Sequence, residues 1–236
     1  RAGAAHEYKG GAMERQDGVK KAVGRADVCE LLASAFSFPD ERLAAGLRDG
    51  ALAADAEACL RDAGADEAVA QEVADGLRAW AGGDAAELCA RMRKTYSRLY
   101  LAPGGRTPVF PYESAFLHVE RELPGIPTLF RSPVTLDVER QMREAGVVAK
   151  NGRKEPCDSV FEEFEFLSYL FAKQADALSR MADDEAVAWG ERARTFARDH
   201  VLAWLPQFMR RTQELADGEP YAALAVLGAA ALEAIV

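Results

Sequence analysis

Apolar residues recur three and four positions apart along most of the chain. In residues 19–38 the recurring apolar positions are Val23, Val28, Leu31, Leu32, Ala35 and Phe36. Residues with this spacing share one face of an α-helix, so the pattern predicts a first helix over this segment. Pro39 ends that helix, and Asp40 is expected to cap the next one at its N-terminus.

The same periodicity continues to the end of the sequence, with breaks at glycine and proline. Residues 40–80 are rich in alanine and broken near Gly50 and Gly64, which predicts two or three short helices. The other segments with helical spacing are residues 84–100, 113–121, 134–145, 158–182, 184–204 and 221–235. Pro206 is expected to kink or restart the chain, and the last segment, apolar nearly all round, is expected to be buried.

Several connectors are too rich in proline or glycine to continue a helix. Residues 101–112 hold three prolines and two adjacent glycines, and residues 123–133 hold three further prolines. Long irregular segments inside compact domains often carry function, so residues 101–112 are a candidate binding loop. Residues 149–155 are expected to form a hinge after a helix that ends at Gly146.

The composition favours an all-α fold. The chain has 236 residues, is 49% hydrophobic and contains many alanines, the best helix former. We expect residues 17–236 to form a single globular helical domain of about 9–11 helices, with a hinge or loop near residues 146–157. Residues 1–16 are polar and glycine-rich, and are expected to be a disordered leader or residues foreign to the natural chain.

Charge and cysteine content restrict the partners and the compartment. The net charge of −9 argues against nucleic acid and favours a basic partner. No segment has the roughly 18–20 apolar residues of a membrane-spanning helix, so stable membrane insertion is not expected. The four cysteines, Cys29, Cys59, Cys89 and Cys157, form no Cys-x-x-Cys pair, so free, buried thiols of a cytoplasmic protein are expected.

Residues that usually carry catalysis are sparse and poorly spaced. His6, His118 and His200 lie in unrelated contexts, so neither a metal site nor a cofactor is expected. Ser114 lacks the glycines of a nucleophile elbow, and the glycine-bearing loop lacks the lysine of a phosphate-binding loop. A thiol reaction at Cys157 and a weak nucleotide site stay as alternatives to a non-enzymatic role.

Aromatic and acidic residues around the proline-rich loop favour peptide binding. The aromatic residues are Tyr96, Tyr100, Phe110, Tyr112 and Phe116. Glu113, Glu155 and Asp158 supply carboxylates, which bind guanidinium groups through paired, charge-assisted hydrogen bonds. A groove lined in this way would hold an apolar helix that follows two arginines. The alternative interpretation is that the aromatic side chains fill the core.

Three motifs resemble a known family. They are Tyr96-x-x-Leu99-Tyr100-x-x-Pro103-Gly104 with Pro111-Tyr112-Glu113-Ser114-x-Phe116, then Glu155-Pro156-Cys157-Asp158, then Phe196-x-x-x-His200-x-x-x-Trp204-x-Pro206-x-Phe208. In order and spacing they are similar, over roughly residues 20–236, to the TorD/DmsD/NarJ family. Members of that family are chaperones that mature molybdenum redox enzymes.

The resemblance implies an all-α cytoplasmic protein without catalytic activity. It implies binding of the twin-arginine signal peptide, or of the apo form, of a molybdenum oxidoreductase until the cofactor is inserted and the enzyme is exported. The client-binding candidates are Tyr112, Glu113, Ser114, Glu155, Pro156 and Asp158, with the aromatic neighbours Tyr100 and Phe116. Ser159 stands where the family motif commonly has histidine, so no proton switch is expected at that position.

Two further points stay open at the level of the sequence. The alternative client is a reductase catalytic subunit without a twin-arginine signal, bound as by a NarJ-like assembly factor. The resemblance permits a monomer or a domain-swapped homodimer.

Overall fold

A computed structural model describes residues 2–102, 107–148 and 155–235, the first eleven of these by their backbone alone. The helices are α1 (Ala2–Phe36), α2 (Glu41–Asp49), α3 (Ala51–Ala63), α4 (Glu67–Arg78), α5 (Ala85–Tyr100), α6 (Glu113–Glu120), α7 (Pro133–Glu144), α8 (Val160–Ser179), α9 (Asp183–Phe196), α10 (Leu202–Leu215) and α11 (Pro220–Ala234). A π-helical turn, Ala197–Val201, joins α9 to α10. The described residues contain no strand, which confirms the all-α prediction.

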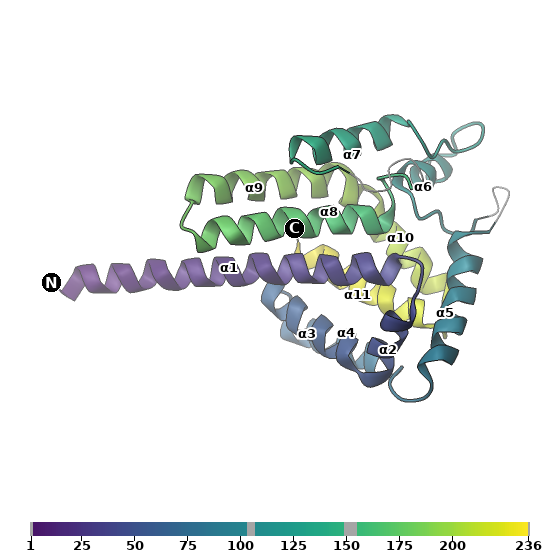
Figure 1. Cartoon of the computed structure of the whole chain (residues 1–236), viewed down its shortest axis with the longest axis horizontal. Coiled ribbons are helices and arrows are strands. Elements are labelled where there is room, and N and C mark those ends of the chain that lie inside the picture. Colours follow the sequence, from purple (N-terminus) through teal and green to yellow (C-terminus); the bar gives the residue numbers. More distant parts are fainter. Residues whose placement is uncertain (1, 103–106, 149–154, 236) are drawn as a thin grey trace.

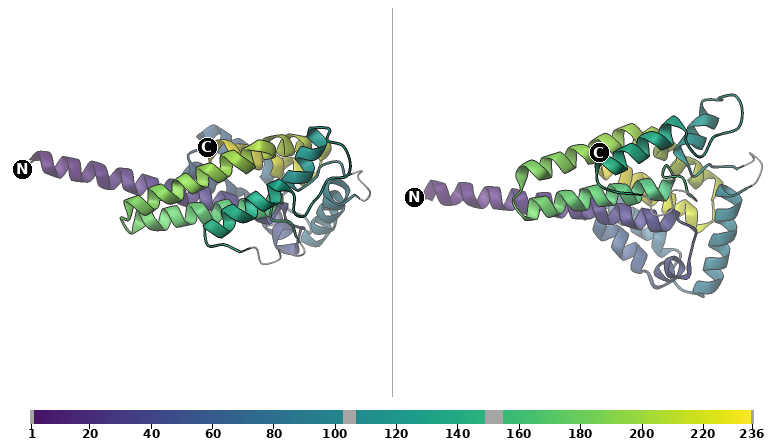
Figure 2. Two further views of the ribbon diagram at one scale, coloured as in Figure 1. Left: turned by 90° about the horizontal axis from the view of Figure 1, so that it is seen from above. Right: turned by 45° about the horizontal axis from the view of Figure 1, so that its top comes forward.

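The long helix α1 is the axis around which the other helices pack. It lies along α8 on one side and α3 on the other, and α8 pairs with α9 (Figure 1). Helices α10 and α11 pack together behind α1, and α5 crosses the end of the bundle (Figure 2). Helix α7 lies on the outside of the molecule, next to α8 and α9.

An aromatic cluster forms the core where α1, α5, α10 and α11 meet. The ring centroid of Phe208 lies 5.6 Å from that of Phe36 and 5.6 Å from that of Tyr100. Tyr221 lies 6.2 Å from Phe36 and 5.9 Å from Tyr96. Edge-to-face and stacked arrangements at these separations add to the stabilisation from apolar burial. The cluster fixes the ends of helices that border the candidate binding loop.

The predicted caps and breaks agree with the structure. Asp40, the expected cap, accepts a hydrogen bond from the amide of Leu43, and Asp84 caps α5 in the same way through the amide of Glu87. Gly50 and Gly64 have φ angles of 80° and 99°, in the left-handed region that favours glycine, and they separate the expected short helices. Gly146, with φ of 79°, follows α7 as expected.

The structure differs from the expected helix limits at the start of α1. Helix α1 begins at Ala2 instead of residue 19, and Arg15 already pairs with Asp183 at the start of α9. The division into residues 1–16 and a domain from residue 17 stays a prediction. The expected hinge at residues 149–155 lies outside the described residues except for Glu155.

The expected restart at Pro206 is wrong. Pro206 lies inside α10, and the irregularity comes earlier, where the amide of Leu202 bonds to the carbonyl of Ala197, five residues back. The wider turn precedes Pro206, whose missing N–H removes one helical hydrogen bond within α10. The chain therefore stays helical from α9 into α10.

Two other expectations concern cysteines and membranes. All four cysteines are free; Cys29, Cys89 and Cys157 are buried, whereas Cys59 is half-buried. Among the described helices, none combines the length and apolar character needed to cross a bilayer.

Candidate functional site

The structure joins two of the motifs that the sequence singled out. The amide of Glu113, at the start of α6, donates to the carbonyl of Asp158, with 2.8 Å between nitrogen and oxygen. The amide of Val160, at the start of α8, donates to the carbonyl of Pro111 at 3.0 Å. These bonds form a short antiparallel bridge between Tyr112 and Ser159, which fixes the two helix starts side by side.

Each helix start is capped, and one cap comes from the other motif. Ser159 Oγ accepts from the amide of Glu162 and caps α8. Tyr112 provides no side-chain cap for α6, and Asp158 Oδ2 instead accepts from the amide of Ser114 at 2.9 Å. A carboxylate at a helix N-terminus accepts unpaired amides and interacts favourably with the helix dipole. Asp158 thus caps α6 across the bridge.

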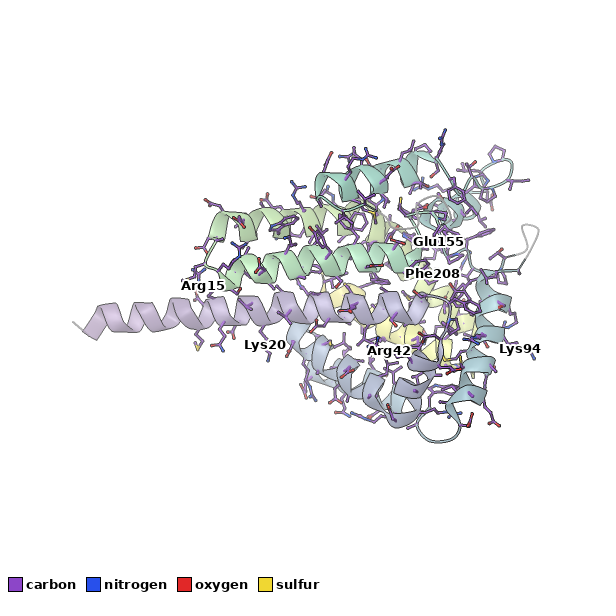
Figure 3. All side chains as sticks on the ribbon, viewed as in Figure 1. Arg15, Lys20, Arg42, Lys94, Glu155 and Phe208 are labelled. Atoms are coloured by element: carbon purple, nitrogen blue, oxygen red, sulfur yellow. The ribbon has the colours of Figure 1, made fainter. Side chains whose placement is uncertain are left out.

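Tyr112 and Glu155 form the partly accessible portion of this site. The Tyr112 hydroxyl donates to Glu155 Oε1 at 2.9 Å, and both side chains are half-buried. Burial raises the pKa of the Glu155 carboxyl, opposed by the Tyr112 hydrogen bond. Glu155 has no ion-pair partner in the described part of the chain. Figure 3 places Glu155 at the end of the molecule away from the N-terminus.

Most of the other client-binding candidates lie in the interior. Glu113, Phe116, Asp158, Tyr100 and Pro156 are buried. The Tyr100 hydroxyl pairs with Thr212, and the Phe116 ring packs 5.6 Å from Trp204. Ser114 is partly accessible as a residue, but its Oγ is buried. The structure therefore brings the candidates together, with Tyr112 and Glu155 at the surface and the rest beneath them.

A buried polar cluster centred on His200 lies below these residues. His200 Nδ1 is 2.8 Å from Glu113 Oε2, and its Nε2 is 3.0 Å from Asp137 Oδ2. Both ring nitrogens face carboxylates, an arrangement that favours the doubly protonated ring, and Gln141 Nε2 also lies 3.2 Å from Nε2. The cluster links α6, through Glu113, to α7, through Asp137.

Burial and neighbouring charges shift the pKa values of the side chains in this cluster. Burial disfavours the His200 imidazolium, but the hydrogen bonds and charges of Glu113 and Asp137 outweigh it and raise its pKa. Hydrogen bonds from Gln141, then from Arg140 and His200, lower the pKa of Asp137 to about 2. Burial and then the charge of Glu113 raise the pKa of Glu163 well above its ordinary value.

Sequence reasoning missed Asp137, Gln141 and Glu163. Glu163 Oε2 accepts from Trp204 Nε1 at 2.9 Å, and Gln141 Nε2 donates to Asp137 Oδ2 at 3.0 Å. The four-residue spacing of His200 and Trp204 indicates that they share a helix face. Nothing in that spacing identifies their partners, because these come from other helices.

Two polar atoms at this site, one of them on Asp158 itself, have no hydrogen-bond partner in the described structure. They are Asp158 Oδ1 and Ser114 Oγ, both buried. Burial raises the pKa of Asp158, opposed by its neighbours Ser114 and Thr135. The Ser114 and Thr135 side chains nevertheless lie close enough to Asp158 to stabilise its carboxylate, so this group is not isolated from donors.

Apolar side chains are exposed on the connector between α6 and α7 and on the helix turns at its two ends. The exposed large apolar residues of this region are Val119, Leu123, Ile126, Phe130 and Leu136. Ile126 is 88% exposed, and two non-glycine residues with positive φ, Glu122 and Arg131, flank the central part. Exposed apolar residues gathered in one segment are typical of protein-binding surfaces.

The residues described offer no group of three or more His, Cys, Asp or Glu side chains arranged to hold a metal ion. The polar cluster around His200 is instead an arrangement of ion pairs and hydrogen bonds between helices.

The described residues thus form an all-helical fold with an exposed apolar connector and a half-buried Glu155 carboxylate. Residues 62–210, more than half of the chain, match the family described as nitrate reductase delta subunit. The chain therefore belongs to this family, whose members are chaperones in the maturation of molybdoenzymes. The match spans both joined motifs and His200, and confirms the resemblance at the level of the chaperone family. No curated protein matches the chain.

Proposed function

We propose that the protein is a cytoplasmic chaperone that binds the apo catalytic subunit of a molybdenum oxidoreductase and holds it until its cofactor is inserted. The observation that carries this proposal is the half-buried Glu155 carboxylate, held by Tyr112 and without a cation partner among the described residues. A partly desolvated carboxylate binds a guanidinium more strongly than a solvated one does. A basic side chain of the client is the matching group.

The connector between α6 and α7 supplies the apolar part of the proposed client surface. Its exposed residues Leu123, Ile126 and Phe130 would contact apolar side chains of the client segment. The connector is tied to the acidic part, because Thr135 Oγ1 donates to the carbonyl of Leu129 and Cys157 Sγ donates to the carbonyl of Thr135. A client segment with basic residues beside apolar ones would use both parts.

The client segment has two proposed forms. One is a twin-arginine signal peptide, in which two arginines precede an apolar helix-forming stretch. The other is a segment of a reductase catalytic subunit that carries no such signal, and the match to nitrate reductase delta subunits favours this form. Tyr112, Glu155 and the exposed connector would bind either, whereas Glu113, Ser114, Phe116, Pro156, Asp158 and Tyr100 would support the site from beneath.

Calorimetric titration tests the proposal. The probes are a synthetic peptide with two adjacent arginines before an apolar stretch, its Lys-Lys version, and the apo catalytic subunit encoded nearest to the chaperone. We expect Glu155→Gln to weaken binding of the arginine peptide or the subunit, and Glu165→Gln, an exposed carboxylate on α8, to leave binding unchanged.

The Lys-Lys peptide separates the two forms of client. Weaker binding of Lys-Lys than of Arg-Arg supports the signal-peptide form, because lysine cannot form the paired hydrogen bonds of a guanidinium. Capture of the subunit without binding of either peptide supports the second form. Binding of neither peptide nor subunit contradicts the proposed function.

A further inference from the structure

A cavity lies between α7 and the pair α8 and α9. Its volume is about 360 Å³, within the range of roughly 300–1,000 Å³ that is usual for small-molecule sites. The lining comes from these three helices and Ala145, and it includes no described residue of the joined motifs. Helix α7 lies on the outside of the molecule beside both partner helices (Figure 2). Well-packed interiors leave few voids larger than a water molecule, so a cavity of this size has room for a ligand.

The floor of the cavity is apolar. Phe166 and Leu170, one turn apart on α8, line it and are otherwise buried. The Phe166 ring is held by Phe196, with 4.7 Å between the ring centroids in an edge-to-face arrangement. Ala188 of α9 adds a third apolar side chain, whose small size leaves space beside the floor. An apolar ring or short chain placed here would be favoured by removal of its surface from water.

The rim of the cavity carries a guanidinium that has no ion-pair partner. Arg192 of α9 lines the cavity and is exposed. Its Nη1 donates to the backbone carbonyl of Glu144 at 3.3 Å, and its guanidinium carbon lies 5.6 Å from the centre of the Trp189 ring. Neither contact neutralises its charge, and no carboxylate among the side chains that the structure describes pairs with it. Arg192 is therefore free to bind an anion.

The charged side chains that α7 brings to the rim are already paired. Arg140 Nη1 lies 2.9 Å from Glu144 Oε1, and Arg140 Nη2 lies 2.7 Å from Asp137 Oδ1. Asp137 also accepts a hydrogen bond from Gln141. Helix α7 thus contributes little unneutralised charge, so the side chains of α8 and α9 decide the sign of the charge at the cavity.

Helices α8 and α9 supply unpaired charges of both signs. Lys173 Nζ lies 5.6 Å from the centre of the Trp189 ring and 5.9 Å from that of Tyr169, and it has no carboxylate partner within the described part of α8 and its surroundings. Glu191 lines the cavity beside Arg192 and is also unpaired among the described side chains. The balance of two cations and one carboxylate is positive, although the whole chain has a net charge of −9.

We propose that this cavity binds a small carboxylate that carries an apolar ring or chain. The apolar body rests on Phe166 and Leu170, and the carboxylate accepts hydrogen bonds from the Arg192 guanidinium. Paired, charge-assisted hydrogen bonds are the usual contact between these two groups. Glu191 repels the bound carboxylate and limits its affinity. The site is separate from the proposed client surface, and the inference does not depend on the proposed function.

Two naphthalene compounds test the charge of the ligand. 2-Naphthoate and 2-naphthylmethylammonium share one ring system and carry opposite charges, so a difference in their affinities reports on the rim and not on the floor. Calorimetric titration of the full chain measures both. We expect 2-naphthoate to bind at one site and the cation to bind roughly tenfold more weakly or less. Equal or tighter binding of the cation, or no binding of 2-naphthoate at millimolar concentration, overturns the proposal.

Two adjacent residues of α9 have opposite expected effects. Arg192→Gln removes the guanidinium and should weaken 2-naphthoate binding roughly tenfold, the size expected for loss of one charge-assisted contact. Glu191→Gln removes the opposing carboxylate and should tighten binding about twofold to threefold. Both side chains are exposed, so neither change should disturb the fold.

The matched control is an arginine outside the cavity. Arg143 of α7 is exposed, pairs with Glu139 and does not line the cavity, so Arg143→Gln should leave 2-naphthoate binding unchanged. Unchanged binding in Arg192→Gln, or weaker binding in Glu191→Gln, overturns the role of Arg192.

Filling the cavity tests where the ligand binds. Because Ala188 is exposed, a tryptophan there can lie over the floor without entering the packed interior, and Ala188→Trp should abolish 2-naphthoate binding. Ala172→Trp, at an exposed alanine of α8 outside the lining, is the control. A ligand that binds only the folded protein raises its Tm, so 2-naphthoate should raise the Tm of the parent and of Ala172→Trp but not of Ala188→Trp. Equal binding by Ala188→Trp and the parent overturns the site.

Discussion

Asp158 Oδ2 accepts a hydrogen bond from the amide of Ser114, 44 residues earlier in the chain. A residue that precedes α8 thereby caps α6, while Ser159 caps α8 itself. The contact joins the two motifs through both backbone and side chain, because the amide of Glu113 also bonds to the carbonyl of Asp158. The two motifs therefore form one structural unit, much of which is buried.

This cap predicts a cost in stability for Asp158→Ala. The substitution leaves the amide of Ser114 without its acceptor, which should lower the free energy of unfolding by about 0.5–2 kcal/mol. Asp158→Asn keeps an acceptor oxygen and should lose less. Urea denaturation measures both variants, and equal stability of Asp158→Ala and the parent would show that the cap is not used in solution.

The raised pKa of Glu163 predicts that the stability of the folded protein depends on pH. Its folded pKa is raised by burial and by Glu113, so the favourable contribution is complete below the ordinary carboxyl pKa and is lost as pH rises toward the folded pKa. Glu163→Gln keeps an acceptor for Trp204 Nε1 and carries no charge. We expect this variant to lose less stability than the parent between pH 5 and pH 7, measured by chemical denaturation.

Glu163→Ala is the contrasting change. It leaves the buried indole N–H of Trp204 without an acceptor, which should cost about 1–3 kcal/mol besides the loss of packing. If Ala and Gln variants were equally stable, the hydrogen bond from Trp204 would not matter.

The raised pKa of His200 predicts that the free energy of unfolding falls as pH rises. Its pKa is raised above the ordinary 6.5, so the imidazolium contribution is fully present below that value and is lost as pH rises through the folded pKa. Nuclear magnetic resonance titration of the ring should give a pKa above 6.5 in the parent. Asp137→Asn should lower that pKa, because it removes one of the two carboxylates, and Glu144→Gln is the control.

The close packing of α1 against α3 at Gly24 predicts that this position has no room for a larger side chain. A Cβ at this position would lie 2.4 Å from the amide nitrogen of Ala63, a backbone atom that cannot move aside cheaply. Gly24→Ala should therefore lower stability by about 1–3 kcal/mol. Gly76→Ala in α4 is the matched control, since it meets no atom within 4 Å and should raise stability by about 0.5–1 kcal/mol. Thermal denaturation compares the two, and a tolerated Gly24→Ala would contradict the close crossing.

A charged side chain in place of Ile126 is expected to weaken client binding without lowering the stability of the fold. The side chain is 88% exposed, so Ile126→Asp removes little buried surface from the folded protein. If the connector forms the apolar part of the client surface, the variant should bind the subunit or the arginine peptide more weakly. Val187→Asp, which changes an exposed apolar residue on α9, is the control for a general effect of charge.

The sequence by itself determined the helices, their caps and the family. Helical spacing identified most of the segments, and Asp40, Gly50 and Gly64 marked their limits, because these signals act through atoms a few residues apart. It did not locate the π-helical turn between α9 and α10, and it did not place Pro206 inside a continuous helix.

Only the tertiary structure decided which candidate residues are accessible. Tyr112 and Glu155 lie at the surface, whereas Glu113 and Asp158 are inside, paired with His200 and Ser114 from distant segments. Burial and partner choice depend on how α6, α7, α8 and the π-helical turn meet, and residue spacing within one segment carries no record of that. The sequence therefore identifies the groups that could act. The packing between helices decides which of them are exposed, which are charged and which are covered.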